Sequence, residues 1–367
     1  MTGVGLVETQ RVGLYSEADP LVLASGHTLG PVEVAYETYG ALAPARDNVV
    51  VVCHALTGDA HAAGHHGDPA RTGWWDSLVG PGRAIDTDRF FVVCANLLGG
   101  CQGTTGPLSA DPGTGRAYGT DFPLLAMTDL VTVQRRLLAE LGIDRVHAAV
   151  GGSLGGMQVL QWALDAPDQL DRAVLVGASS RLTAENIAFS TVARTAILRD
   201  PDFAGGHYPA TGRSPEVGLA VARILAHITY LSEESLEVKF GRRRRDDGPP
   251  RLGTHFEVES YLEHQAEVFL ARFDALSYLY LTRVMDYFDP FADPTAAPRI
   301  AGGGTRFLML SFDSDWRFPT PHSERIHRQL VEAGVSSEHE ELHSSWGHDS
   351  FLLEPPGYHD RVRAFLG

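Results

Sequence analysis

The sequence predicts an α/β protein in which a mostly parallel, doubly wound sheet is interrupted by an inserted block of helices. Three observations support this prediction. Apolar, β-branched runs alternate with helical stretches over residues 1–180, the pattern is helical over 181–301, and a buried-strand pattern returns at 306–312. Such alternation is typical of parallel sheets whose crossover helices cover both faces. We therefore expect a core of residues 1–180 and 302–367, with residues 181–301 inserted as a helical lid.

The predicted strands are of two kinds. Apolar and polar residues alternate in residues 32–40 (VEVAYETYG), which is typical of an antiparallel strand near a sheet edge. Continuous apolar runs instead indicate strands buried on both faces, as in parallel sheets. These runs are NVVVVCHA (48–55), RFFVVCANL (89–97), VHAAVGGS (146–153), RAVLVGAS (172–179) and RFLMLSF (306–312).

Helical patterns fill most of the remaining chain. The predicted helices cover residues 124–142, 154–167, 217–231, 261–285, 322–334 and 356–366. A more polar strand is expected at 336–342, before the terminal helix. The AGGG segment at 301–304 predicts a short flexible return from the helical block to the sheet.

The charge balance argues against nucleic-acid binding. The 367 residues carry a formal net charge of −16, and phosphate neutralisation needs a basic surface. Four consecutive arginines, Arg242 to Arg245, form the one strong basic run, and two aspartates follow at once. This run is interpreted either as a solvated loop with compensated charge or as a local patch that binds phosphate groups of a charged cofactor.

The sequence also favours a cytoplasmic protein outside the membrane. No apolar stretch reaches the roughly 18 residues needed to span a bilayer. The first residues, MTGVGLVETQRVGL, lack the basic and apolar segments of a secretory signal. Three cysteines, Cys53, Cys94 and Cys101, are too few for a disulfide framework in so long a chain.

The strongest chemical signal is the pentapeptide GGSLG at 151–155, which fits the pattern G-x-S-x-G. A predicted strand precedes it and a predicted helix follows, which is the context of the nucleophile turn in the α/β-hydrolase fold. The turn is tight, so small residues, Gly151 and Gly155, must flank the serine. It presents the Ser153 hydroxyl at the carboxyl ends of the strands. It also puts the Leu154 amide at a helix N-terminus, where it can stabilise an oxyanion.

A serine nucleophile needs a histidine base and an orienting carboxylate, which follow the serine in this order in the fold. Asp313 and Asp315 come directly after the strand at 306–312, and either suits the acid on physical grounds. His348 lies in the loop after the last predicted strand and is our candidate for the base. The loop after the strand at 48–55 supplies a second oxyanion donor, for which the Leu56 amide is the candidate.

Histidines and aspartates also gather at the end of the strand at 48–55 and just after it. They are His54, Asp59, His61, His65, His66 and Asp68. Their spacing matches none of the metal-binding motifs, so no metal site is predicted.

Several long segments resemble homoserine O-acyltransferases, the acyl-CoA-dependent enzymes of methionine biosynthesis with an α/β-hydrolase fold. The resemblance covers nearly the whole chain in order, the helical insert included, and is looser at the N-terminus, 109–120 and 242–257. The matching segments are CHALTGDAH (53–61), GWWDSLVGPGRAIDTDRFFVVCANLLGGCQGTTGP (73–107), GGSLGGMQ (151–158), ARILAHITYLS (222–232), KFGRR (239–243) and WGHDSFLLE (346–354).

The resemblance implies a ping-pong reaction on Ser153, which takes an acyl group from acyl-CoA and passes it to the hydroxyl of L-homoserine. His348 would serve as base and acid in both halves of the reaction, held by Asp315 rather than Asp313. The amides of Leu56 and Leu154 would bind the oxyanion. Acyl-CoA is then a co-substrate, and no bound cofactor or metal is implied.

The resemblance also implies an acceptor site. Arg223 and Asp349 correspond to homoserine-binding residues, with Tyr230 nearby. One cation and one anion suit the carboxylate and ammonium of a zwitterionic amino acid. The alternative is that Arg223 is a helix-surface cation and Asp349 an acid at a helix N-terminus.

The acyl donor is either succinyl-CoA or acetyl-CoA. The sequence DWRF at 315–318 resembles the succinyl-using members of the family, and a buried Arg317 would clamp the carboxylate of a succinyl group. If Arg317 instead lies at the surface, acetyl-CoA is the expected donor.

Two other kinds of function remain as alternatives. An esterase or thioesterase would use the same catalytic residues with water as the second nucleophile, unless the lid excludes water. A non-catalytic binding module would be expected to lack one of the catalytic residues. The long apolar faces of the helical block, as in ILAHITYL (224–231), favour a homodimer formed through the lid, as in the family.

Overall fold

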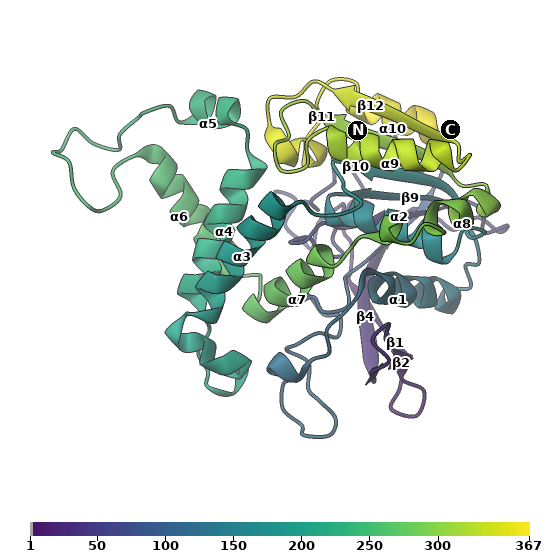
Figure 1. Ribbon diagram of the computed structural model, residues 1–367, viewed down its shortest axis with the longest axis horizontal. Coiled ribbons are helices and arrows are strands. Elements are labelled where there is room, and N and C mark those ends of the chain that lie inside the picture. Colours follow the sequence, from purple (N-terminus) through teal and green to yellow (C-terminus); the bar gives the residue numbers. More distant parts are fainter. Residues whose placement is uncertain (1–2) are drawn as a thin grey trace.

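The computed structural model describes residues 3–367 and confirms the predicted α/β fold (Figure 1). Eight strands form one sheet in the order β1-β4-β8-β5-β9-β10-β11-β12. The first two pairings, β1 with β4 and β4 with β8, are antiparallel, and all those from β8 to β12 are parallel. In chain order the strands are β1 (Gln10–Tyr15), β4 (Val32–Tyr39), β5 (Val49–Cys53), β8 (Phe91–Ala95), β9 (Val146–Gly152), β10 (Leu170–Val176), β11 (Arg306–Phe312) and β12 (Ser337–Leu342).

The central strands are buried on both faces, as their apolar runs predict. Every residue of β5 is buried. Val49 and Val51 pack into the apolar core on one face of the sheet, whereas Val50 and Val52 pack into the core on the other. This division follows from the period of two in a β-strand, and it requires a covering layer on each side.

Four helices complete the α/β core. Helices α1 (Met127–Glu140), α2 (Leu154–Asp165) and α9 (Pro321–Glu332) contribute buried side chains to one core, and α10 (Tyr358–Leu366) contributes to the other. Short elements connect them. They are β2 (Leu21–Val22), β3 (Thr28–Leu29), β6 (Val79–Gly80), β7 (Ile85–Asp86) and the 3-10 turns η1 (Gly119–Asp121), η2 (Pro201–Gly206), η3 (Tyr208–Ala210), η4 (Pro290–Ala292) and η5 (Gly347–Leu352).

The chain between β10 and β11 is helical and carries no strand of the main sheet. Its helices are α3 (Ala184–Leu198), α4 (Glu216–Tyr230), α5 (Glu233–Lys239), α6 (Glu257–Leu270), α7 (Ala275–Asp286) and α8 (Ala296–Gly303). Helix α4 packs between α3 and α6, and this group projects to one side of the sheet (Figure 1). We call the segment from α3 to α7 the lid.

Two sequence predictions in this region need correction. The single helix predicted at 261–285 is broken into α6 and α7, because the side chain of Asp274 caps α7 by accepting the N–H groups of Leu276 and Ser277. The predicted flexible segment at 301–304 mostly belongs to α8, and only Gly304 adopts the left-handed conformation that ends that helix.

Two further findings concern membrane-spanning helices and disulfide bonds. Within residues 3–367, none of the helices has both the length and the apolar character needed to cross a bilayer. The three cysteines, Cys53, Cys94 and Cys101, are all free thiols.

Candidate active site

Ser153 occupies the sharp turn between β9 and α2, at the carboxyl end of the sheet. Its φ of 56° and ψ of −122° lie outside the regions that a serine ordinarily adopts, so the surrounding packing must hold it there. That packing is close. A Cβ at Gly155 would lie 2.0 Å from the carbonyl oxygen of Cys53, and one at Gly151 would lie 2.3 Å from the carbonyl carbon of Gly155. Strand β5, strand β9 and helix α2 therefore meet at backbone contact around the serine.

His348 is brought to the same place by η5, after β12. Its Nδ1 lies 2.7 Å from Oδ2 of Asp315, and both side chains are almost completely buried. The other carboxylate oxygen of Asp315 accepts the N–H groups of Arg317 and Phe318, each at 2.9 Å. Ser153 and His348 line one pocket. The arrangement leaves Nε2 as the imidazole nitrogen available on the other side of the ring.

The structure separates the two candidate aspartates. Asp313 turns away from His348, and its Oδ2 lies 2.6 Å from Nδ1 of the exposed His343. Its Oδ1 accepts the N–H of Ser344 at 2.9 Å. The pKa of the Asp313 carboxyl stays below its ordinary value, because hydrogen bonds from Ser344 and His343 outweigh the effect of burial. This pair lies on the loop surface and is independent of the buried Asp315–His348 pair.

The pocket that holds Ser153 and His348 has a volume of about 660 Å³ and lies between the core and the lid. Leu56 lines it from the loop after β5, and Leu154 begins α2 directly behind the serine. The N-terminus of α2 carries the positive end of the helix dipole, and the Leu154 amide lies at that end.

The lid and the core supply opposite charges to this pocket. Arg223 from α4 and Asp349 from η5 both line it, together with Tyr230. The buried Nε of Arg223 has no hydrogen-bond partner among the described residues, and its guanidinium lies 5.0 Å from the ring centre of Phe269. Burial raises the pKa of Asp349 to about 6, although the charges of His348 and Arg223 oppose that rise. A half-buried guanidinium whose Nε has no hydrogen-bond partner and a half-buried carboxyl that line the same pocket form a site suited to a zwitterion.

A second, smaller cavity adjoins this pocket and shares Leu56 and Tyr230 with it. Arg317 lines the cavity, and its buried Nη1 has no hydrogen-bond partner among residues 3–367. The guanidinium also lies 5.6 Å from the ring centre of Phe189 on α3. Arg317 thus places a partly buried guanidinium beside the active site. An anionic group there would supply the missing hydrogen-bond partner of Nη1.

Sequence reasoning missed several residues that line the main pocket, among them Thr57, Trp74 and Arg272. The Nη1 of Arg272 donates a hydrogen bond of 2.8 Å to the carbonyl of Thr57, next to Leu56. Trp74 belongs to the GWWD segment that carries the family resemblance, so the sequence did contain a signal that could have identified it. Arg272 stands in no motif, and only the break between α6 and α7 turns it toward the pocket.

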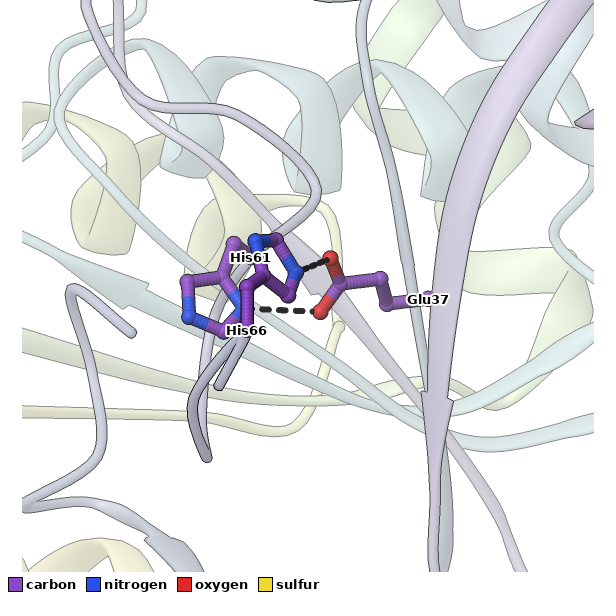
Figure 2. Close-up of side chains that lie close together, drawn as sticks. All are labelled: Glu37, His61 and His66. Carbon is purple, nitrogen blue, oxygen red and sulfur yellow. Dashed lines mark hydrogen bonds and ion pairs between the residues drawn. The ribbon is translucent and has the colours of Figure 1, made fainter. Parts of the chain in front are cut away.

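The histidines of the segment after β5 lie in different parts of the structure. His61 and His66 converge on the buried carboxylate of Glu37 in β4, with their rings 3.8 Å apart (Figure 2). Their nitrogens lie 2.9 Å and 2.7 Å from its two oxygens. His54 is elsewhere, with Nδ1 2.8 Å from the carbonyl of Ala55.

Glu37, His61 and His66 are the one group within residues 3–367 whose side chains could together hold a metal ion. One possible ligand atom from each of the three lies within 4.8 Å of the others. The carboxylate is nevertheless already saturated by hydrogen bonds, since Thr9 and Tyr39 also donate to it at 2.8 Å. Burial raises the pKa of Glu37, but these four hydrogen bonds outweigh it and lower the pKa to about 2. The cluster anchors the loop after β5 to strand β4.

Comparisons with known proteins show the family to which the chain belongs. Residues 48–355 match a family model described as alpha/beta hydrolase fold. The homoserine O-succinyltransferase of Nocardioides sp. is 63% identical over 369 residues, which cover 100% of each chain. Other curated relatives carry the names homoserine O-succinyltransferase and homoserine O-acetyltransferase.

Two solved structures are also similar. The crystal structure of homoserine O-acetyltransferase from Bacillus anthracis has a TM-score of 0.90 and 28% identity, covering 99% of this chain and 98% of that one. The crystal structure of esterase E22 has a TM-score of 0.89 and 28% identity, covering 99% of this chain and 100% of that one. The same fold thus holds both transferases and a hydrolase.

Proposed function

The chain belongs to the homoserine O-acyltransferases of the α/β-hydrolase fold, and we propose that it transfers an acyl group, succinyl in preference to acetyl, from acyl-CoA to L-homoserine. The observation that carries this proposal is a single pocket that contains Ser153, the Asp315-bound His348 and the charged pair Arg223 and Asp349. A simple esterase needs only Ser153, His348 and Asp315. The charged pair beside them suits an amino-acid acceptor.

In the first half-reaction, Ser153 Oγ attacks the thioester carbonyl while His348 Nε2 takes the hydroxyl proton. The carbonyl oxygen becomes an oxyanion, which the amides of Leu56 and Leu154 stabilise. When the C–S bond breaks, the CoA sulfur receives the proton from His348, and the acyl group remains on the serine as an ester. Asp315 holds the imidazole in one tautomer and stabilises its charged form.

In the second half-reaction, the hydroxyl of homoserine attacks the acyl-serine and gives its proton to His348. The serine oxygen leaves with that proton, which restores the free enzyme. Arg223 binds the acceptor carboxylate and Asp349 its ammonium group, which holds the hydroxyl toward the ester carbon. Such positioning favours homoserine over water as the nucleophile.

The preference for succinyl-CoA rests on Arg317. Its unpartnered Nη1 faces a small cavity that adjoins the catalytic pocket and shares Leu56 and Tyr230 with it. A succinyl group ends in a carboxylate, which would satisfy the guanidinium, whereas an acetyl group would leave it unpaired. The alternative donor is acetyl-CoA.

The decisive experiment measures CoA release with succinyl-CoA and with acetyl-CoA, each with homoserine, with serine and with neither amino acid. We expect rapid release only when homoserine is present, and faster release with succinyl-CoA. Ser153→Ala should abolish release from both donors. Arg317→Leu should lower kcat/KM for succinyl-CoA by about 100-fold and change that for acetyl-CoA by less than about 3-fold. Equal losses with both donors would remove the role of Arg317.

Hydrolysis is the second candidate function, because esterase E22 has nearly the same fold. Water would then attack the acyl-serine in place of homoserine. The same experiment separates the two functions, since an esterase releases CoA at an undiminished rate without any amino acid. Detection of O-acylhomoserine by mass spectrometry identifies the product directly.

The proposal includes the state of the protein in the cell. We expect a cytoplasmic homodimer that needs no bound cofactor or metal and binds neither nucleic acid nor membranes. Exposed apolar side chains on α4 and α6, such as Val217, Val221 and Val268, support pairing through the lid. Light scattering at micromolar concentration tests this, and a monomeric mass would contradict it.

A further inference from the structure

A groove leads away from the catalytic pocket along α5. It has a volume of about 920 Å³, and it shares Asp349 and Leu352 with the pocket that contains Ser153. Its walls are formed by Val238 on α5 and by Trp346 and Leu353 on the segment around η5. The groove therefore adjoins the pocket of the proposed acylation site and is lined on one side by α5.

The groove walls are apolar, and their side chains remain unusually accessible. Val238 is 78% exposed, Leu353 is 42% exposed and Trp346 is 37% exposed. Trp316, at the opposite side of α5, donates its indole N–H to the carbonyl of Leu231, which fixes the start of that helix relative to the core. An apolar, preformed groove of this kind suits a long, flexible arm with few charges of its own.

The groove also carries a positive charge. Lys239, the only lysine in the sequence, lines it at the last position of α5. Among residues 3–367 its ammonium group forms no ion pair, and it lies 4.1 Å from the ring centre of Tyr261. Five of the seven residues from 239 to 245 are cations in a chain whose formal net charge is −16. An anion approaching this acidic protein would meet its densest positive charge here.

The arginine run extends this basic region. Arg243 is paired with Glu257 at 2.7 Å, whereas Arg242 and Arg244 have no ion pair in the described part of the chain. Arg242 and Arg244 line another hollow of about 820 Å³, beside Arg251. Arg251 is itself engaged by Asp246 at 2.7 Å. Arg245 likewise has no ion pair among the described residues, so Lys239 is followed within six residues by three arginines whose charge is uncompensated.

We propose that this groove holds the pantetheine arm of the acyl-CoA donor and that Lys239 binds a CoA phosphate, with Arg242 and Arg244 as the adjacent cations. This inference rests on the proposed function, because it assumes that the acyl group is delivered to Ser153 as a CoA thioester. The thioester end reaches the pocket past Asp349 and Leu352, and the diphosphate and 3′-phosphate stay at the lid surface. A lysine ammonium is well suited to bind phosphate as a point charge.

The test compares two donors that share the thioester and differ in the phosphates: succinyl-CoA and the succinyl thioester of N-acetylcysteamine. Lys239→Gln should lower kcat/KM for succinyl-CoA by about 10-fold, mainly through KM, and leave the short thioester and the KM for homoserine unchanged. Lys239→Arg should retain most of the activity with succinyl-CoA. The control variant is Arg306→Gln, because Arg306 is an exposed cation at the opposite end of β11 and should affect neither donor.

The outcomes distinguish a failure of the phosphate-binding proposal from a failure of the proposed acyltransferase function. If Lys239→Gln loses activity equally with both donors, the role of Lys239 is structural, which contradicts phosphate binding. Unchanged activity with succinyl-CoA contradicts phosphate binding as well. In either case the wild-type protein still transfers the acyl group. A wild-type protein that transfers from neither thioester contradicts the proposed function itself.

Discussion

Replacing Asp315 with asparagine tests the proposed catalytic arrangement most directly. The side chain keeps its shape, and its carbonyl oxygen can still accept the N–H groups of Arg317 and Phe318 that now bind Oδ1 at 2.9 Å. The amide nitrogen then faces Nδ1 of His348, where Oδ2 now lies at 2.7 Å. Two donors would face each other, so the imidazole must change tautomer and place its proton on Nε2. That nitrogen could no longer accept the proton of Ser153.

The expected loss in kcat is about 10⁴-fold, as for the equivalent change in a serine–histidine–aspartate triad. At about 1.36 kcal/mol for each factor of ten, this corresponds to about 5.4 kcal/mol of transition-state stabilisation. The KM for homoserine should change by less than about 3-fold, because Arg223 and Asp349 are untouched. Loss of a charged, buried hydrogen bond should also lower the free energy of unfolding by about 1–3 kcal/mol.

Asp313→Asn is the matched control, since Asp313 is only two residues away and also binds a histidine. Its partner, His343, lies at the surface, and the pair does not line the catalytic pocket. Activity should stay within about 3-fold of the wild type. CoA release is followed with a thiol reagent at saturating substrates, and thermal unfolding shows that both variants are folded. Equal losses in the two variants, or more than a tenth of wild-type activity in Asp315→Asn, would refute the assignment.

Three further predictions concern the acceptor site, the Glu37 cluster and the serine turn. The KM for homoserine should fall as the pH rises through about 6, because burial raises the pKa of Asp349 to about 6 and only its carboxylate form binds the ammonium; Asp349→Asn should remove this dependence. Glu37→Gln should lower the free energy of unfolding at pH 7 by about 3 kcal/mol in urea titrations. The difference should shrink as the pH falls from 4.5 toward about 2, because the low pKa of folded Glu37 stabilises the protein only while the carboxylate is ionised. Gly155→Ala should yield insoluble or inactive protein, since its Cβ would lie 2.0 Å from the Cys53 carbonyl, whereas Gly302→Ala has open space and should be tolerated.

The parallel part of the fold could be predicted because local patterns determine it. The apolar runs at 48–55 and 146–153 belong to strands buried on both faces, and such strands require parallel neighbours and covering helices. The same runs end where the chemical motifs begin. A parallel sheet brings its carboxyl ends to one edge, so the sequence order of Ser153, Asp315 and His348 was enough to place them near one another.

Other features depend on contacts that no local pattern encodes. Glu37 alternates with apolar residues in a strand that looked half-exposed, yet its carboxylate is fully buried. It is satisfied there only because the loop after β5 folds back and supplies His61 and His66. Similarly, the continuous helical pattern at 261–285 hid the break at Asp274, where a side-chain cap outweighs helix propensity and turns Arg272 toward the pocket.

The direction of Arg317 shows how one interaction can determine both catalysis and specificity. The DWRF sequence places an arginine near the acid but does not say where its side chain points. In the structure Oδ1 of Asp315 accepts two successive N–H groups, from Arg317 and Phe318, which curls the chain tightly around the carboxylate. This turn buries Phe318 against His348, with ring centres 5.1 Å apart, and leaves Arg317 facing the adjoining cavity. A carboxylate that orients the catalytic histidine with one oxygen thus uses the other to direct the cation that would select the acyl donor. Changes to Asp315 that break these two hydrogen bonds, such as Asp315→Ala, should therefore reduce the preference for succinyl-CoA as well as kcat, whereas Asp315→Asn should reduce kcat and leave the donor preference unchanged.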